Sequence, residues 1–293
     1  MKVGMVGVGR LGAQLVFNLI SNPRIDEIQI MDIIKGRVEG TILDVSHAYP
    51  QFAGKLKDVD KIDADIIIIT AGFPRTTEKT RIELYEKNRK VMEEVLKQLK
   101  LNDKTIIILL TNPVEPLTYF IHKNSGLSWR KVIGFSNILD TARLKFTISK
   151  MAGVNGDKIK TLVVGEHGEK MIPLFSQTIV DGKKLEDFGI DKVEVEKKVK
   201  EVSRRIIETM GGTQFGPATH LTNLINAITD GTEEIFSLSF YLEEKHYGLK
   251  DVCISLPVKV GNDGIKEVVE LELSDEEKER LIEVAECLKE VEF

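Results

Sequence analysis

The fold of this chain is decided by a short stretch near its start, residues 2–12, which reads KVGMVGVGRLG. Its first five residues have the apolar character of a β-strand, and an amphipathic helical pattern follows the last glycine. The glycine spacing is typical of a turn that binds the phosphates of a dinucleotide. Gly7 permits the tight turn, Gly9 lets the backbone approach a pyrophosphate, and Gly12 lets helix and strand pack closely.

An acidic residue follows this turn at the distance that a dinucleotide-binding unit needs. Asp32 closes the second expected strand, about twenty residues beyond Gly12. Its carboxylate would accept hydrogen bonds from the adenosine ribose and repel a 2′-phosphate, which favours NAD over NADP. Lys35 and Arg37 lie nearby and weaken that preference. The alternative is a tight turn without a ligand, followed by an acid that caps a helix.

The first half of the chain alternates apolar runs with helical segments. The expected strands cover residues 2–6, 27–31, 65–70, 105–110 and 131–133. Successive parallel strands need crossover connections, which are usually helical. The pattern therefore predicts an α/β fold with a doubly wound parallel (Rossmann) sheet and helices on both faces.

The pattern changes after about residue 140. Expected helices cover residues 139–152, 193–210 and 219–228, and expected strands cover residues 161–164, 172–179, 235–241, 252–260 and 267–273. A turn at residues 261–264 indicates a hairpin, and Ser274 with Glu277 forms the capping box of a last helix. We expect a dinucleotide-binding domain over residues 1–136 and an α+β substrate-binding, catalytic domain over residues 137–293.

Composition argues against several classes of protein. The 293 residues are 42% hydrophobic and 30% charged, with a formal net charge of -5 that gives no electrostatic footprint for nucleic acid. No apolar stretch reaches the roughly 18 residues of a membrane span, and the start has no signal pattern. Cys253 and Cys287 lack metal-ligand spacing. We expect a cytoplasmic protein without a metal or a membrane partner.

Two arginines lie on a polar loop directly after the apolar run at residues 65–70. Arg75 and Arg81 would stand just outside the carboxyl end of a central parallel strand, where open α/β sheets bind ligands. Guanidinium groups match carboxylates with two hydrogen bonds. A small carboxylic acid is therefore the expected ligand.

Further polar residues fall near other strand ends. Asn112 could bind a ligand or cap the following helix. Asp140 and Arg143 share one face of an expected helix, as a site or as a surface ion pair. His167 lies between glycines at the end of a strand, where it could donate a proton or serve the structure. Residues 211–217 form a glycine-rich break between two helices.

In this order, and over essentially the whole chain, these motifs resemble the lactate/malate dehydrogenase family. The resemblance implies that His167 donates and accepts the proton, that Asp140 orients it, and that Arg81 polarises the reacting carbonyl. Arg143 would bind the C1 carboxylate. The other implied substrate residues are Asn112, near the carbonyl and the nicotinamide, and Thr213. The implied cofactor residues are Gly7, Gly9, Arg10, Leu11, Gly12, Asp32, Ala71, Gly72, Asn88 and Asn112.

The resemblance also places Arg75 at the position that selects the substrate. Malate dehydrogenases of the family carry arginine there, and lactate dehydrogenases carry glutamine. The implied activity is reversible hydride transfer between NADH and oxaloacetate, giving (S)-malate, as in the tricarboxylic acid cycle. Residues 76–79 read TTEK, where family loops usually carry Lys-Pro-Gly or a similar run. Family relatives are dimers or tetramers, so a homo-oligomer, such as a homotetramer, is implied.

Other functions are compatible with parts of this pattern. A lactate or dual-specificity 2-hydroxy acid dehydrogenase is the nearest alternative. A non-catalytic dinucleotide sensor would have no need of a proton donor beside three arginines. An NAD-dependent glycosidase on a related fold would need metal ligands, and no Cys/His constellation of that kind is present in the sequence.

Overall fold

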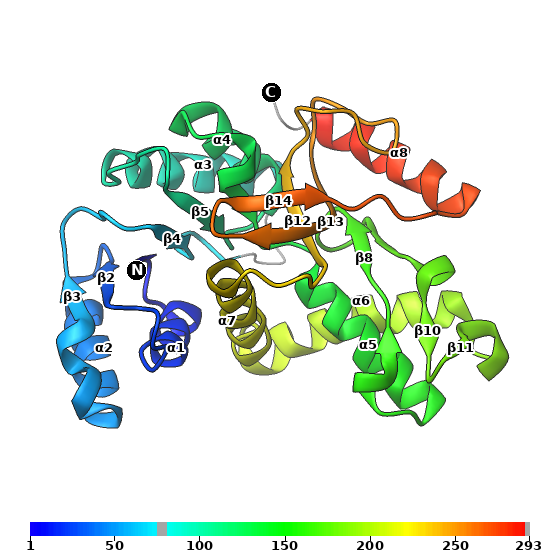
Figure 1. Ribbon diagram of the computed structural model, residues 1–293, viewed down its shortest axis with the longest axis horizontal. Coiled ribbons are helices and arrows are strands. Elements are labelled where there is room, and N and C mark those ends of the chain that lie inside the picture. Colours follow the sequence, from blue (N-terminus) through cyan, green and yellow to red (C-terminus); the bar gives the residue numbers. More distant parts are fainter. Residues whose placement is uncertain (75–80, 291–293) are drawn as a thin grey trace.

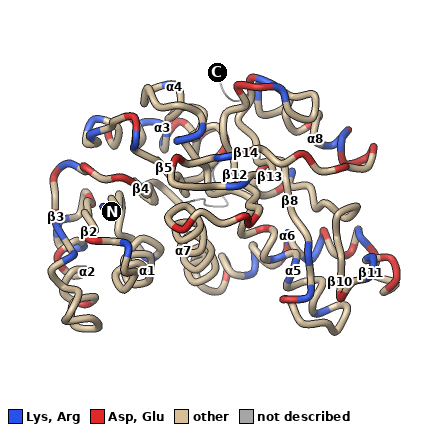
Figure 2. Tube along the Cα trace, viewed as in Figure 1, with Lys and Arg blue, Asp and Glu red and all other residues tan. Residues whose placement is uncertain are grey.

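The computed structural model describes residues 1–74 and 81–290 of the chain (Figure 1). The expected selector Arg75 and the unusual run at residues 76–79 lie outside the described residues. Basic and acidic residues are interspersed along the described elements (Figure 2). No helix in the described part of the chain is long and apolar enough to cross a membrane.

The first half forms the expected parallel sheet. Its strands are β1 (Lys2–Val6), β2 (Glu27–Met31), β3 (Leu56–Asp58), β4 (Ile66–Ile69), β5 (Ile106–Leu109) and β6 (Val132–Gly134). They pair in parallel in the order β3-β2-β1-β4-β5-β6. The central strands β4 and β5 are buried along their whole length, which explains their unbroken apolar sequence. The predicted doubly wound Rossmann sheet is confirmed.

Helices and short 3₁₀ turns connect these strands. They are α1 (Arg10–Leu19), α2 (Lys35–Ala48), α3 (Arg81–Lys97), α4 (Val114–Ser125) and the 3₁₀-helices η1 (Pro50–Lys55) and η2 (Trp129–Lys131). The chain leaves β1 toward β2 and β3 on one side and returns to β4 on the other. The strand order therefore reverses at β1, and the crevice at such a point is where open α/β sheets bind ligands.

The second half has the expected mixed α+β character. Its helices are α5 (Ile138–Ala152), α6 (Lys192–Met210), α7 (Phe215–Asp230), α8 (Asp275–Lys289), η3 (Gly156–Lys158), η4 (Phe175–Gln177) and η5 (Leu185–Phe188). Its strands are β7 (Ile159–Lys160), β8 (Val163–Gly165), β9 (Met171–Pro173), β10 (Ile179–Val180), β11 (Lys183–Lys184), β12 (Phe236–Tyr241), β13 (Cys253–Gly261) and β14 (Gly264–Val268). Pairing among these strands is antiparallel.

One sheet passes through both halves. Strand β12 pairs antiparallel with β6, where Ser239 faces Gly134, and the sheet continues to β13, β8 and β9. Helix α7 lies between α1 and α5 (Figure 1), and Asn22 donates a 2.8 Å hydrogen bond to Asn226 across the contact of α1 with α7. The halves are thus joined by backbone pairing as well as by helix packing. A domain boundary after residue 136 stays a prediction.

The expected bounds of two strands were wrong. The run at residues 172–179 is broken after Pro173: the Leu174 amide still donates to the Leu162 carbonyl at 2.9 Å, and the chain then turns into η4 before β10 joins a separate small sheet. The strand expected at residues 267–273 begins earlier, at Gly264, because the tight turn pairs that residue directly with Gly261. The hairpin itself is confirmed. Strand β3 was not anticipated from the sequence.

The capping box of α8 is confirmed and has a second task. The Ser274 hydroxyl accepts from the Glu277 amide at 3.2 Å, and the Glu277 carboxylate accepts from the Ser274 amide at 2.9 Å. The same carboxylate accepts from the Ser176 amide at 3.0 Å and from the Ser176 hydroxyl at 2.5 Å. Glu277 therefore fixes both the start of α8 and the η4 turn.

We expect Glu277→Ala to lower the free energy of unfolding by about 2 kcal/mol, because the cap and the bonds to Ser176 are lost together. Urea denaturation followed by circular dichroism would measure the change. Glu276→Ala is the control, since that exposed carboxylate stands in the same helical turn. Equal losses in the two variants would contradict the second task of Glu277.

Candidate active site

The glycine turn after β1 has the shape that a dinucleotide needs. Gly7 has φ +91°, and a Cβ there would lie 2.8 Å from the Ala71 amide nitrogen. A Cβ on Gly12 would lie 2.0 Å from the Gly7 carbonyl oxygen, whereas one on Gly9 would meet nothing within 4 Å. Helix α1 begins here without a side-chain cap, which leaves its first amides for an anion. The turn therefore fits a pyrophosphate.

Asp32 is held beside this turn by the backbone. Its Oδ2 accepts from the Val8 amide at 2.9 Å and its Oδ1 from the Ile34 amide at 2.8 Å. The N-cap residue of α2 is Ile34, so the alternative in which this acid simply caps the helix is wrong. Lys35 is paired with Asp60 at 2.7 Å, and Arg37 lies 3.9 Å from Asp32. The ribose contact of Asp32 stays a prediction.

Asn88 ties together two loops that follow neighbouring strands. Its side chain is fully buried; Oδ1 accepts from the Phe73 amide at 2.7 Å, and Nδ2 donates to the carbonyls of Phe73 at 3.2 Å and Asn112 at 2.6 Å. Gly72 lies in the same loop, and a Cβ on it would lie 2.3 Å from Thr111. The geometry gives Asn88 a positioning task. The cofactor contacts expected of Ala71, Gly72 and Asn88 stay predictions.

The glycine turn also touches the second half of the chain. The Arg10 guanidinium donates to the Met210 carbonyl at the C-terminal end of α6, and it lies close to Gly211. This contact places the glycine-rich break at residues 211–217 next to the turn. Thr213 is thereby brought to the same region as the expected cofactor residues.

A cavity of about 720 Å³ gathers the substrate residues expected within the described part of the chain. They come from five separate segments, because Asp140 and Arg143 share α5. The shared lining residues are Arg81, Asn112, Asp140, Arg143, His167 and Thr213. The N-cap residue of α4 is Pro113. Asn112 therefore does not cap this helix, and the capping alternative for Asn112 is wrong. No group of three or more His, Cys, Asp or Glu side chains among the described residues is arranged to hold a metal ion.

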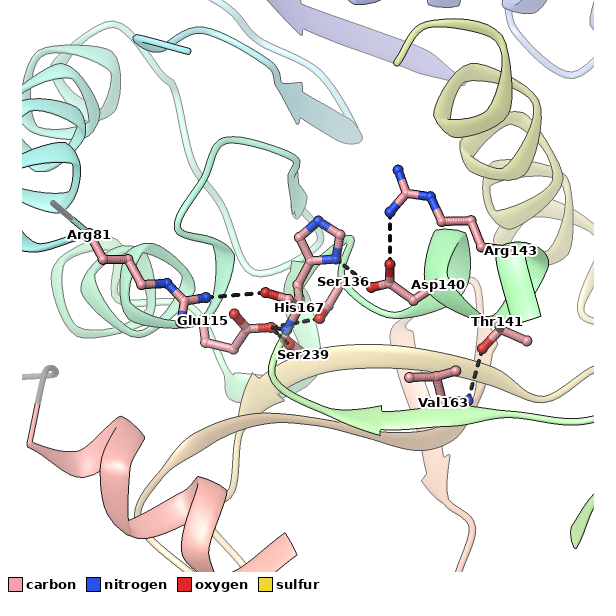
Figure 3. Close-up of polar contacts among 9 residues, drawn as sticks. All are labelled: Arg81, Glu115, Ser136, Asp140, Thr141, Arg143, Val163, His167 and Ser239. Atoms are coloured by element: carbon pink, nitrogen blue, oxygen red, sulfur yellow. Dashed lines mark hydrogen bonds and ion pairs between the residues drawn. The ribbon is translucent and has the colours of Figure 1, made fainter. Parts of the chain in front are cut away.

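His167, Asp140 and Arg143 form a hydrogen-bonded row at the wall of this cavity (Figure 3). His167 Nδ1 lies 2.6 Å from Asp140 Oδ2, and Arg143 donates to Asp140 Oδ1 at 2.9 Å. Asp140 is only 2% exposed, so the alternative of a surface ion pair is wrong. The other ring nitrogen of His167, Nε2, is turned away from Asp140 (Figure 3).

The contacts within this row shift the pKa values of His167 and Asp140 in opposite directions. Burial alone would lower the pKa of His167, but the Asp140 carboxylate outweighs burial and raises this pKa above its usual range. Burial alone would raise the pKa of Asp140, but His167 and Arg143 together lower it. Asp140 is therefore the ionised partner, and His167 keeps its proton to a higher pH than a free imidazole.

A buried carboxylate that the sequence analysis missed fixes the backbone of His167. Glu115 is 0% exposed, and its Oε1 accepts from the His167 amide at 3.0 Å, the Ser136 hydroxyl at 2.6 Å and the Ser239 hydroxyl at 2.9 Å (Figure 3). An acid inside the apolar run of α4 was the available signal. A second missed acid, Glu166, is mostly buried and forms an ion pair with Arg81.

One face of α6 forms another wall that was not anticipated. Its lining residues recur at helical spacing: Val199, Lys200, Ser203, Arg204, Ile207 and Glu208. Lys200 is paired with Glu196 at 3.0 Å. The periodicity of residues 193–210 indicates such a face, but nothing in the sequence indicates that it borders the cavity.

Comparison with known proteins agrees with this geometry. Residues 1–134 match the NAD-binding domain of lactate/malate dehydrogenases, and residues 138–292 match their alpha/beta C-terminal domain. The chain is 32% identical to an L-lactate dehydrogenase 2 of Bacillus cereus, over 99% of this chain and 96% of that protein. It is 33% identical to malate dehydrogenase of Methanosphaera stadtmanae, over 98% and 95%.

A solved structure of a relative has the same fold. Malate dehydrogenase from Archaeoglobus fulgidus in complex with NADH superposes with a TM-score of 0.87 at 32% identity, covering 100% of this chain and 98% of that one. NAD is thus the cofactor of the N-terminal half. The chain belongs to the lactate/malate dehydrogenase family, whose members are NAD-dependent dehydrogenases of 2-hydroxy acids.

Proposed function

We propose that this chain is an NAD-dependent malate dehydrogenase that interconverts oxaloacetate and (S)-malate. The observation that carries the proposal is the row of His167, Asp140 and Arg143 at the wall of a cavity that also contains Arg81 and Asn112. A proton donor with a raised pKa beside two guanidinium groups suits a 2-keto acid whose carbonyl oxygen becomes an alkoxide.

Different residues of the chain carry out different parts of the proposed reaction. The turn of Gly7, Gly9 and Gly12 would hold NADH, which would supply the hydride. Nε2 of His167 donates the proton to the carbonyl oxygen, and Asp140 keeps the ring oriented and stabilises its charged form. In the oxidation of malate, neutral His167 accepts the proton from the hydroxyl group.

The two arginines of the cavity have separate tasks. Arg143 binds the C1 carboxylate, because its guanidinium is fixed by Asp140 on one side and borders the cavity. Arg81 stabilises the negative charge that develops on the carbonyl oxygen. Orienting the keto acid between these groups converts an encounter into a near-intramolecular step.

Substrate choice rests on the charge available for a second carboxylate. Arg75 would pair with the second carboxylate of oxaloacetate but would be left without a partner against the methyl group of pyruvate. On the α6 wall of the cavity, Arg204 is positively charged, whereas Lys200 is paired with Glu196 and Glu208 is negatively charged. The second candidate is a lactate or dual-specificity dehydrogenase, because the Bacillus cereus relative is named a lactate dehydrogenase at a similar identity.

Several finer points stay predictions. They are a preference for NAD over NADP, a homo-oligomeric state as dimer or tetramer, a cytoplasmic location and a place in the tricarboxylic acid cycle. The division of the chain after residue 136 is proposed in the same sense. It follows the last strand of the parallel part of the sheet, β6, and precedes α5.

We expect His167→Asn to remove most turnover while NADH binding is kept, since the variant loses the proton donor but leaves the glycine turn intact. Absorbance of NADH with oxaloacetate measures turnover, and fluorescence titration measures binding. His47→Asn is the control, because that histidine stands near the end of α2. Turnover close to that of the unmodified enzyme would exclude His167 as the acid.

We expect Arg75→Gln to lower kcat/KM for oxaloacetate by orders of magnitude and to narrow the gap to pyruvate. Lys79→Gln, which removes a positive charge from the same segment of sequence, is the matched control. Steady-state assays of both keto acids with NADH give the comparison. If pyruvate is already preferred by the unmodified enzyme, the lactate alternative stands in place of the malate proposal.

We expect kcat/KM for reduction to be retained at low pH and to fall as the pH rises through the raised pKa of His167, because reduction needs the protonated ring. Asp140→Asn removes the group that raises this pKa, so the fall should move to lower pH. Asp103→Asn, a substitution on an exposed turn, is the control. A profile that does not move in Asp140→Asn would contradict this account of the histidine.

A further inference from the structure

The backbone N–H and the backbone carbonyl of His167 are both bound by side chains from the first half of the chain. Its N–H donates to Glu115 of α4 at 3.0 Å, and its carbonyl accepts from Nη2 of Arg81 at 3.1 Å (Figure 3). Nη1 of Arg81 forms an ion pair with the Glu166 carboxylate. The guanidinium of Arg81 is thus bound at two points of the segment that carries the proton donor.

We propose that Glu166 is a positioning residue that holds the guanidinium of Arg81 at the cavity wall beside His167. The proposal rests on the function proposed above, in which Arg81 acts on the reacting carbonyl. Glu166 itself precedes His167 in sequence and is absent from the cavity lining, whereas Arg81 and His167 both border the cavity. Its effect on the reaction would therefore pass through Arg81.

The carboxylate in this ion pair is less exposed to water than that of an ordinary surface pair. The Glu166 side chain is 7% exposed, and that of Arg81 is 40% exposed. Burial raises the pKa of the Glu166 carboxyl, and nearby Glu115 adds to this effect, while Arg81 opposes it. Attraction between charges grows as water is excluded. A carboxylate so placed favours a cation at its one paired oxygen, since Oε2 has no hydrogen-bond partner among the described residues.

The second contact of Arg81 fixes the orientation of its guanidinium group. An arginine side chain has several rotatable bonds, so a single ion pair would leave its fork free to swing. Binding Nη1 to Glu166 and Nη2 to the His167 carbonyl fixes the plane of the guanidinium. Each of these nitrogens carries a second hydrogen, which remains for an oxygen in the cavity. Glu166 thereby sets the position of Arg81 relative to the histidine.

In the main competing interpretation, Glu166 hinders the binding of substrate by Arg81. If Glu166 instead competes with the substrate for Arg81, its removal would free the guanidinium and lower KM. Holding the guanidinium in place predicts the reverse pattern, a loss in kcat that exceeds any change in KM. The split between kcat and KM therefore separates the two interpretations.

The first test compares Glu166→Gln with Glu93→Gln, using NADH and whichever of oxaloacetate and pyruvate is the better substrate. Glu93 is the matched control, because its carboxylate pairs with Arg89 on α3, the helix that begins at Arg81. We expect Glu166→Gln to lower kcat by at least about tenfold with KM changed less, and Glu93→Gln to leave both unchanged. An unchanged kcat in Glu166→Gln, or a lowered KM, would overturn the proposal.

The second test asks whether Glu166 binds a guanidinium group that is not attached to the chain. Arg81→Ala should lose turnover, and added guanidinium ion should restore part of it by occupying the space between Glu166 and the His167 carbonyl. The same addition to the double variant Arg81→Ala, Glu166→Gln should restore little. Thermal melting of each variant identifies any loss of folding, and Glu166→Asp, which keeps the charge, should retain part of the activity.

The outcomes distinguish this proposal from the function on which it rests. Equal restoration in the single and double variants would overturn the positioning task of Glu166 and leave the dehydrogenase proposal standing. Full turnover by Arg81→Ala without any addition would refute the catalytic task of Arg81, and the proposal for Glu166 with it. A preference for pyruvate over oxaloacetate affects only the choice of substrate.

Discussion

The carboxylate of Glu115 is the constraint on which the site depends. It stands at the start of α4 in the first half of the chain, and it accepts hydrogen bonds from three segments that follow it in sequence, at Ser136, Ser239 and His167. A buried carboxylate is unfavourable unless donors surround it. The three donors converge on its Oε1, whereas Oε2 has no hydrogen-bond partner among the described residues, and this convergence brings the end of β8 to the seam between the halves.

The local elements could be predicted from sequence because their determinants are local. The unit of β1, α1 and β2 follows from glycine spacing and apolar periodicity, and Ser274 with Glu277 marks the start of α8 within four residues of chain. The misplaced strands depended on more than periodicity. Strand β9 ends where the chain turns into η4, and the start of β14 is set by the geometry of a turn.

The site could be predicted only in part, because it is assembled from distant segments. Asp140 and Arg143 share a helical turn, but the contact of Asp140 with His167 spans 27 positions and depends on how α5 meets β8. Resemblance to a family supplied that pairing. Glu115, Glu166 and the α6 wall were missed for a physical reason. The two acids matter because they are buried, and the α6 wall matters because it borders a cavity made by other elements; the spacing of a single element shows neither property.

Helix α5 carries Asp140 and Arg143 on one turn, so the residue proposed to tune the proton donor and the residue proposed to bind the keto acid cannot shift independently. The position expected to select the substrate lies on a different segment of the chain. Such a separation lets evolution or a protein engineer alter the choice of substrate through one exchangeable segment while the chemical apparatus is inherited intact. Related chains with either substrate could then diverge by few changes and without rebuilding the catalytic step.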